Sequence, residues 1–237
     1  ENCIGNGVMA ADYQPFIKAF QEKLDSEGLF CGEFWGKWFT SAALAYEYNP
    51  RPEYFKKLED AVEGLLAAQE EDGRISASKE DFTPWDIWGR KYALLGLLAY
   101  YDLTRSGRVL EAAKRMADQL ISKTTGDGGR RISDTGLEAL RGLSSCSVLQ
   151  PFVLLYERTE KERYLSYAEN LVASWSLPSA YSPEGLRLLE QAVPGCIPAE
   201  IAAPKGYEIM SCYAGVLDLY RVTGKKQYLD AVTAYME

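Results

Sequence analysis

The sequence contains no histidine, so it lacks the commonest zinc ligand and the usual acid or base of enzymes that work near neutral pH. A Ser-His-Asp triad is excluded for the same reason. The five cysteines are scattered without a CxxC pair, and their odd number gives poor support for a disulfide framework. Chemistry in these residues must therefore use carboxylates, thiols, tyrosine or arginine, and we expect neither a metal site nor a cofactor within them.

Long hydrophobic runs and an excess of positive charge are also missing. The longest apolar run, Tyr92 to Tyr101, is far shorter than the roughly 20 residues needed to cross a bilayer. Lys and Arg total 26 against 34 Asp and Glu, which disfavours a nucleic-acid partner. We therefore expect neither membrane spanning nor nucleic-acid binding. The first residues, Glu1 to Ile4, have no basic flank and no apolar stretch. These residues do not determine the cellular compartment, and a periplasmic or secreted location is preferred to a cytoplasmic one.

One short sequence motif recurs four times along the chain. The motif is an apolar stretch that contains a tyrosine, and the stretch ends at Thr, Asn or Gly. Its copies are Leu44–Asn49, Leu98–Thr104, Leu154–Thr159 and Asp218–Gly224. Each copy closes an apolar helix, and an alanine-rich, charged segment with helical spacing follows each one. The repeat predicts four antiparallel helix pairs.

The two helices of each pair differ in polarity. The first helices, at about 34–48, 88–103, 147–158 and 209–222, are apolar nearly all round, whereas the second, at about 52–69, 107–123, 161–175 and 225–237, are amphipathic. Helices that are apolar on every face lie inside, and amphipathic ones lie outside. The pattern predicts an all-α fold, an (α/α) toroid of antiparallel helix hairpins with about four of six hairpins present. An open solenoid of helix pairs would give the same local pattern.

We interpret residues 1–237 as a single segment of such a toroid, incomplete at its C-terminus because the sequence stops inside an outer helix. Long irregular connections are expected at 70–86, 124–145 and 176–206, each between an outer helix and the next inner one. Because long loops inside compact domains are usually functional, the end of the ring where the inner helices begin is the expected working face.

Two tryptophan clusters, Trp35–Trp38 and Trp85–Trp88, stand at the starts of successive inner helices. Indole faces stack on the C–H faces of sugars, and neighbouring acids and arginine bind the hydroxyls. The alternative is that these aromatic rings only fill the core. The predicted substrate-binding residues at this rim are Glu33, Trp35, Trp38, Asp86, Trp88, Arg90, Tyr92, Ser145, Glu208 and Cys212.

Each polar candidate also has a structural alternative. Acids at helix starts serve as caps, and Arg90 with Asp86 would make a salt bridge on one helix face. Ser145 lies in a run of small residues that suits a helix cap, and Cys212 suits a buried structural thiol.

Taken together, three stretches resemble a known family. They are Gly32–Trp38, then Trp85–Tyr92 running into Gly96–Thr104, then Tyr207–Tyr213 running into Leu219–Gly224. In order and spacing they look like the toroid of glycoside hydrolase family 127, the beta-L-arabinofuranosidase type, over almost the whole chain.

The resemblance implies an (α/α)6 barrel followed by β-sandwich modules, acting on L-arabinofuranosyl or related glycans. It also implies a zinc-bound thiolate nucleophile and a glutamate acid/base, whose motifs lie C-terminal to the matched portion, so zinc is expected only in a complete enzyme. Family members place histidines at the mouths of early inner helices, and Tyr92 and Cys212 occupy two such positions here.

The sequence thus predicts a glycosidase segment that supplies a substrate-binding rim, with a carbohydrate as partner besides the rest of its own polypeptide or a second copy. The catalytic residues stay unknown. Asp86 and Glu208 would form an inverting pair only at a carboxyl separation of about 6.5–9.5 Å. The rival interpretations are a non-catalytic helical-repeat binding module, and a sugar lyase or epimerase with Tyr92 or Tyr207 as base.

Overall fold

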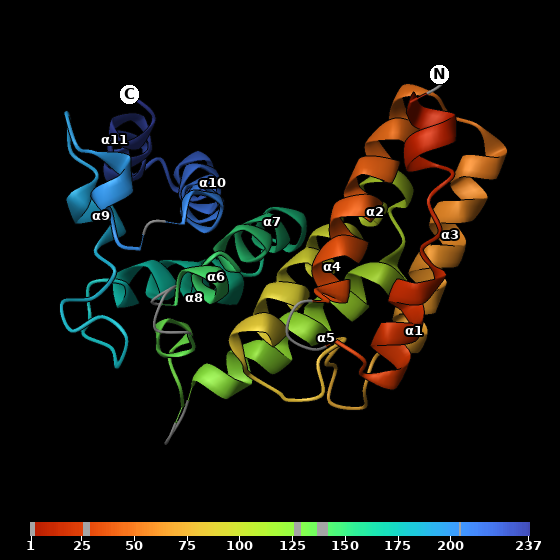
Figure 1. The fold of residues 1–237 in the computed structure, drawn as a ribbon, viewed down its shortest axis with the longest axis horizontal. Coiled ribbons are helices and arrows are strands. Elements are labelled where there is room, and N and C mark those ends of the chain that lie inside the picture. Colours follow the sequence, from red (N-terminus) through yellow and green to blue (C-terminus); the bar gives the residue numbers. More distant parts are fainter. Residues whose placement is uncertain (1–2, 26–28, 126–128, 137–141, 204) are drawn as a thin grey trace. The chain divides into compact units, whose positions relative to one another are not determined.

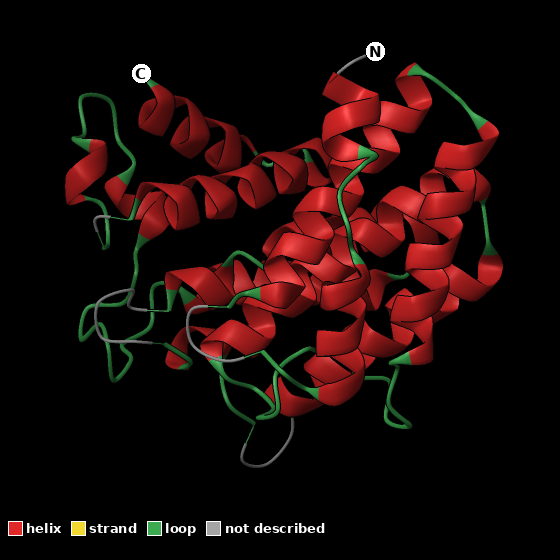
Figure 2. Ribbon diagram, turned by 45° about the vertical axis from the view of Figure 1, so that its right-hand side comes forward, coloured by secondary structure: helices red, strands yellow, loops and turns green. Residues whose placement is uncertain are grey.

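The computed structural model describes residues 3–25, 29–125, 129–136, 142–203 and 205–237. Within them all regular structure is helical, apart from an isolated β-bridge between Asp25 and Ser78 (Figure 2). None of the described helices is long and apolar enough to span a membrane. The α-helices are α1 (Gln14–Glu22), α2 (Cys31–Tyr48), α3 (Pro52–Ala67), α4 (Pro84–Thr104), α5 (Gly107–Thr124), α6 (Leu143–Cys146), α7 (Leu149–Thr159), α8 (Glu162–Ser174), α9 (Leu188–Gln191), α10 (Gly206–Thr223) and α11 (Lys226–Met236).

The four predicted helix pairs are confirmed as α2–α3, α4–α5, α7–α8 and α10–α11, each joined by a short turn (Figure 1). Local chemistry fixes the turns. Pro52 begins α3 after an extended Arg51, because proline disfavours the helical conformation in the residue before it and suits the first helical position. Gly224 ends α10 with a left-handed φ of 67° and donates its N–H to the carbonyl of Tyr220.

The difference in polarity between inner and outer helices is also confirmed. In the outer helix α5 the large buried side chains, Val109, Met116 and Leu120, recur on one face. In the inner helix α4 the buried residues include the consecutive pair Ala93 and Leu94 and most of the residues around them, so little of this helix is solvent-exposed.

The chain divides into two compact units, which are described separately. The first unit comprises Glu1–Asp81 and Trp88–Leu120, and the second comprises Phe82–Ile87 and Ile121–Glu237. The interpretation of residues 1–237 as a single toroid segment stays a prediction. In the first unit the sequence analysis missed α1, which packs on α2 and α3 and contributes the fully buried Phe20.

The long connections are shorter than predicted, because helices extend into them. Helix α4 begins at Pro84, α5 runs to Thr124, and α6 and α9 occupy parts of the other two connections. Residues 126–128, 137–141 and 204 of the predicted connections lie outside the described residues. Within the second unit two connections contact one another, since Arg131 donates a hydrogen bond to the carbonyl of Pro178 (2.7 Å).

Glycines allow the inner helices α2 and α4 to approach closely within the first unit. A Cβ atom added at Gly36 would lie 2.4 Å from the carbonyl oxygen of Tyr92, and one at Gly32 would lie 3.0 Å from the Cα of Gly89. On the other helix, a Cβ at Gly96 would lie 2.6 Å from the ring of Trp35. Side chains at these positions would push the two helices apart.

We therefore expect Gly36→Ala to lower the free energy of unfolding by about 1–3 kcal/mol, because the new methyl group overlaps backbone that cannot move cheaply. Gly107→Ala is the matched control, since nothing lies within 4 Å of its Cβ position. The control should be neutral or stabilise by about 0.5–1 kcal/mol, the usual gain from replacing a helical glycine. Urea denaturation measures both variants, and equal effects would contradict the proposed close contact.

Candidate functional site

Within the first unit, the close packing of α2 and α4 brings the first turn of α2 beside the part of α4 that begins at Trp88. The start of α2 is held by Asp25, whose carboxylate accepts the backbone N–H groups of Cys31 (2.9 Å) and Gly32 (3.3 Å). This satisfies two donors that a helix N-terminus otherwise leaves unpaired. Glu33, in the same turn, is therefore fixed in position relative to Trp88 on α4.

The carboxylate of Glu33 is held from two sides. Trp88 donates its indole N–H to Oε2 (2.6 Å), and Lys37 donates from Nζ to Oε1 (2.5 Å). The side chain of Glu33 is 14% exposed and that of Lys37 is 37% exposed, whereas Trp88 is buried. The solvent-facing part of this arrangement is thus a carboxylate beside an ammonium group, with the indole behind them.

A second lysine contacts the ring of Trp88. The ammonium group of Lys91 lies 4.6 Å from the ring centroid of Trp88 and 4.7 Å from that of Tyr92, within the range of a cation–π interaction. Both Lys91 and Tyr92 are buried. We call Glu33, Lys37, Trp88, Lys91 and Tyr92 the Glu33 cluster.

Two of the predicted sugar-binding tryptophans pack against other aromatic rings, Trp35 in the buried core and Trp38 at a half-buried position. Trp35 is fully buried and stacks on Phe39, with ring centroids 4.9 Å apart. Trp38 stacks on Tyr13 at 5.0 Å and donates its indole N–H to the carbonyl of Val8 (2.8 Å). The structure therefore favours the core-filling alternative for Trp35, whereas Trp38 is half-buried with one face of its ring and its N–H occupied by protein groups. Phe20, which packs edge-on against Trp35, and the two partners of Trp38 come from the segment before the first repeat.

Asp86 occupies a capping position at the start of α4. Its carboxylate accepts the backbone N–H of Phe82 (2.9 Å), and its own N–H donates to the hydroxyl of Thr83 (3.2 Å), as in a capping box. The side chain is fully buried. The structure favours the capping alternative over a substrate-binding carboxylate.

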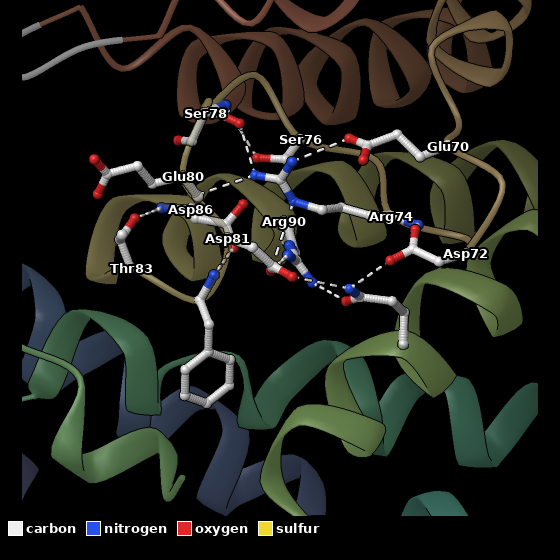
Figure 3. A network of polar contacts seen from close by, with 12 residues as sticks. Glu70, Asp72, Arg74, Ser76, Ser78, Glu80, Asp81, Thr83, Asp86 and Arg90 are labelled. Atoms are coloured by element: carbon white, nitrogen blue, oxygen red, sulfur yellow. Dashed lines mark hydrogen bonds and ion pairs between the residues drawn. The ribbon is translucent and has the colours of Figure 1, made fainter. Parts of the chain in front are cut away.

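Arg90, also fully buried, stands in a polar network that shapes the connection before α4 (Figure 3). Its guanidinium donates to Asp81 and to Gln119, and Gln119 in turn donates to Asp72 (2.9 Å). Arg74 donates to the backbone carbonyls of Ser78 and Glu80 in the same connection. These contacts favour a structural role for Arg90, which holds the connection against the helices.

Glu208, Ser145 and Cys212 lie in the second unit, and all three are buried. Lys205 lies 3.7 Å from Oε1 of Glu208, at the start of α10. The hydroxyls of Ser145 and Thr135 hydrogen-bond at 2.7 Å, and the thiol of Cys212 lies 3.5 Å from the carbonyl of Leu143. The buried thiol fits the structural alternative for Cys212, whereas Ser145 lies inside α6 and bonds to Thr135, so it does not act as the predicted helix cap. Burial raises the pKa of the neighbouring Cys146 thiol well above its usual value, so this group stays protonated.

Comparison with known proteins gives a consistent result. A sequence profile described as the GH127 catalytic domain of beta-L-arabinofuranosidase matches residues 2–197. The chain belongs to glycoside hydrolase family 127. This confirms the family resemblance stated above. The matched residues include the motifs from Gly32 to Thr104, whereas the stretch from Tyr207 to Gly224, with Glu208 and Cys212, lies beyond them.

Individual relatives are distant. A non-reducing end beta-L-arabinofuranosidase of Bifidobacterium longum subsp. longum is 26% identical over 157 residues, which are 57% of this chain and 22% of that protein. A solved GH127 beta-L-arabinofuranosidase of Geobacillus stearothermophilus T6 matches with a TM-score of 0.70 and 17% identity. A solved GH127 beta-arabinofuranosidase matches with a TM-score of 0.64, also at 17% identity, over 99% of this chain and 38% of that one.

These likenesses confirm the predicted fold class, an all-α fold of (α/α) toroid type. The match to the Geobacillus structure covers 100% of this family 127 chain but 41% of that enzyme. The chain thus spans less than half the length of the relatives that it matches.

Sequence reasoning missed two members of the Glu33 cluster, Lys37 and Lys91. The spacing of Glu33 and Lys37, four residues apart on a helix, is a signal that it could have used. Trp88 and Lys91, three residues apart on α4, give a comparable signal.

No group of three or more His, Cys, Asp or Glu residues that could hold a metal ion occurs in the described part of this family 127 chain. The zinc that the resemblance implies therefore has no set of ligands among those residues, and no step of the function proposed below is assigned to it.

The Arg90 network predicts an unequal cost for two arginine substitutions. Arg90→Met should lower the free energy of unfolding by about 2–3 kcal/mol, because the contacts of the buried guanidinium with Asp81 and Gln119 are lost. This expected loss is smaller than the roughly 3–5 kcal/mol for breaking a fully buried ion pair, since Asp81 is 29% exposed. Arg108→Met, whose partner Glu63 lies in an exposed pair, should cost less than about 1 kcal/mol. Chemical denaturation of both variants checks this difference, and an Arg90→Met loss no larger than that of Arg108→Met would show that the network does not stabilise the fold.

Proposed function

We propose that this chain is part of a glycoside hydrolase that acts on arabinofuranosyl-containing or related glycans, and that the Glu33 cluster holds a sugar of the substrate. Membership of family 127 and the beta-L-arabinofuranosidase activity in the names of its relatives support the reaction class. The observation that supports the site is the carboxylate of Glu33 in the first turn of α2, which is held by Lys37 of the same helix and by Trp88 of α4.

The roles within the cluster follow from exposure. An ionised carboxylate has about four lone-pair sites, and two hydrogen bonds from Trp88 and Lys37 leave acceptor capacity for sugar hydroxyls. Lys37, the more exposed partner, would donate to a sugar oxygen. Trp88 and Tyr92 are buried, so they act as positioning residues that keep the carboxylate and the lysines in place. This division replaces the stacking role that the sequence assigned to Trp88.

The geometry assigns neither a nucleophile nor an acid/base. Asp86 serves as a cap, and Glu208 is buried beside Lys205. The inverting pair of Asp86 and Glu208 therefore remains an untested alternative, as do a non-catalytic binding module and a lyase or epimerase. A periplasmic or secreted location and a homo-oligomeric state are likewise expectations.

The test uses the polypeptide as the cell makes it. We expect that it releases arabinose from an aryl β-L-arabinofuranoside and that it carries zinc, which elemental analysis would detect. Release of arabinose by a polypeptide without zinc would support the hydrolase activity and contradict the expected zinc. A polypeptide that binds arabinosides without releasing arabinose would support the helical-repeat module instead, and an unsaturated product would support a lyase.

Within that polypeptide Glu33→Gln should reduce kcat/KM or substrate affinity by about 10- to 100-fold, because hydrogen bonds to a charged group contribute about 1.5–3 kcal/mol each. Trp88→Phe removes one hydrogen bond to the carboxylate without touching the sugar, so its effect should be a few-fold. Restoring the donor by Trp88→His should recover part of that loss, which a purely structural role would not show.

The control is Glu59→Gln on the outer helix α3, where a glutamate also pairs with a lysine of its own helix, at 3.9 Å. It should leave kcat/KM unchanged. If Glu33→Gln behaved like Glu59→Gln while remaining folded, the Glu33 cluster would not be the sugar site.

A further inference from the structure

Phe34 is an exposed aromatic residue beside the Glu33 cluster. It follows Glu33 in the first turn of α2 and is 48% exposed. Nearby rings of the same helix are used in the core, where Trp35 stacks on Phe39 with centroids 4.9 Å apart. Within the described part of the chain, Phe34 makes no contact with another aromatic ring or with a cation. A face of its ring is therefore available to a ligand.

Helical geometry places Phe34 next to the solvent-facing groups of the cluster. Residues three or four apart are neighbours on a helix surface. Lys37 comes four residues after Glu33 and three after Phe34, so it lies between them. Glu33 and Lys37 are partly exposed, and Ser41, one turn further along the same side, is exposed as well. A carboxylate, an ammonium group and an aromatic ring thus follow one another on the exposed side of α2.

The backbone that carries Phe34 is held in place. Its N–H donates to the carbonyl of Phe30 (3.0 Å), and the carboxylate of Asp25 accepts the first two N–H groups of α2. These bonds satisfy donors that the first turn of a helix otherwise leaves unpaired. The Cα atoms of Phe34 and Glu33 are therefore fixed relative to one another, as two groups that bind one extended ligand would have to be.

An exposed ring beside hydrogen-bonding groups matches the two kinds of surface that a sugar presents. The C–H face of a sugar packs on an aromatic ring, and its hydroxyls bind polar side chains. The aromatic rings of the Glu33 cluster, Trp88 and Tyr92, are buried. Successive side chains on a helix diverge by about 100°, so Phe34 is directed away from the sugar that Glu33 would hold and towards whatever is attached to that sugar.

We propose that Phe34 stacks on the sugar residue next to the one held by the Glu33 cluster, so that the first turns of α2 bind two consecutive sugar residues of a glycan. This inference rests on the proposed function of the Glu33 cluster and extends it from one sugar to two. It makes Phe34 a specificity-determining residue, because its ring favours substrates in which a second sugar is linked to the arabinofuranosyl group.

The experiment compares two substrates with the polypeptide as the cell makes it. Methyl β-L-arabinofuranoside has one sugar ring, whereas a β-linked disaccharide of L-arabinofuranose has two. Phe34→Ala should lower kcat/KM for the disaccharide by about three- to tenfold, the range expected for one lost stacking contact. It should leave kcat/KM for the methyl glycoside unchanged, since that substrate has no second ring.

Two further substitutions separate stacking on a sugar from packing against protein. Phe34→Trp keeps a flat aromatic face and should keep the preference for the disaccharide. Phe34→Leu keeps apolar volume without such a face and should lose the preference, as Phe34→Ala does. If another part of the polypeptide covered Phe34 instead, Phe34→Leu would be tolerated and the larger Phe34→Trp would lower the melting temperature.

Leu44→Ala is the matched control. Leu44 is also an apolar residue on the exposed side of α2, at 66% exposure, but it lies about 15 Å further along the helix. Its substitution should leave kcat/KM for both substrates unchanged. Glu33→Gln should lower kcat/KM for both substrates by a similar factor, because both contain the sugar that Glu33 holds.

The outcomes distinguish this inference from the function on which it rests. If Glu33→Gln lowers kcat/KM for both substrates and Phe34→Ala leaves their ratio unchanged, the Phe34 contact is wrong and the Glu33 site stands. An equal loss for both substrates in Phe34→Ala also contradicts the contact with a second sugar. If Glu33→Gln has no effect, or if neither substrate is cleaved, the proposed function itself fails and the Phe34 inference fails with it.

Discussion

The close approach of α2 and α4 is the constraint on which the candidate site depends. Glu33 and Trp88 come from different helices, and their side chains can be hydrogen-bonded at 2.6 Å only because the two backbones nearly touch. The absent side chains of Gly32 and Gly36 make that contact possible. A glycine inside a helix costs about 0.5–1 kcal/mol relative to alanine, so each of these positions gives up helix stability for proximity.

Proximity alone would not hold α4 in register, because the connection that precedes it has almost no regular structure. Buried polar groups perform this task. Arg74 satisfies carbonyls of that connection directly, and Arg90 anchors Asp81 at its end. Arginine suits such a position because its planar group presents five donors in a fixed geometry. The sequence analysis placed the charge of Arg90 at a sugar-binding rim. In the structure this charge instead fixes the path of the connection that leads into α4.

Periodicity in the sequence is enough to predict the helix pairs and their inner and outer layers, since each outer helix buries a single face. It could not tell which tryptophan lies in the core. Inner helices are apolar nearly all round, so a period of 3.6 residues marks no preferred face. Trp35 is covered by Phe20 of α1, which lies outside the repeat. The sequence could offer a capping role for Asp86 as an alternative, because Thr83 lies three residues earlier, at the spacing of a capping box. The partners of Arg90, by contrast, are set by tertiary packing.

The indole N–H groups of Trp88 and Trp38 have different kinds of acceptor, and the difference is more than folding stability requires. One backbone carbonyl is sufficient to satisfy an indole N–H, as that of Val8 does for Trp38. Trp88 bonds instead to a carboxylate that is itself 14% exposed and paired with a half-exposed lysine. Partly exposed ion pairs contribute little to folding, about 0–1 kcal/mol, and a desolvated charge carries its own cost. A buried donor that orients a partly exposed carboxylate therefore adds little to folding, which supports the proposal that this carboxylate contacts a ligand.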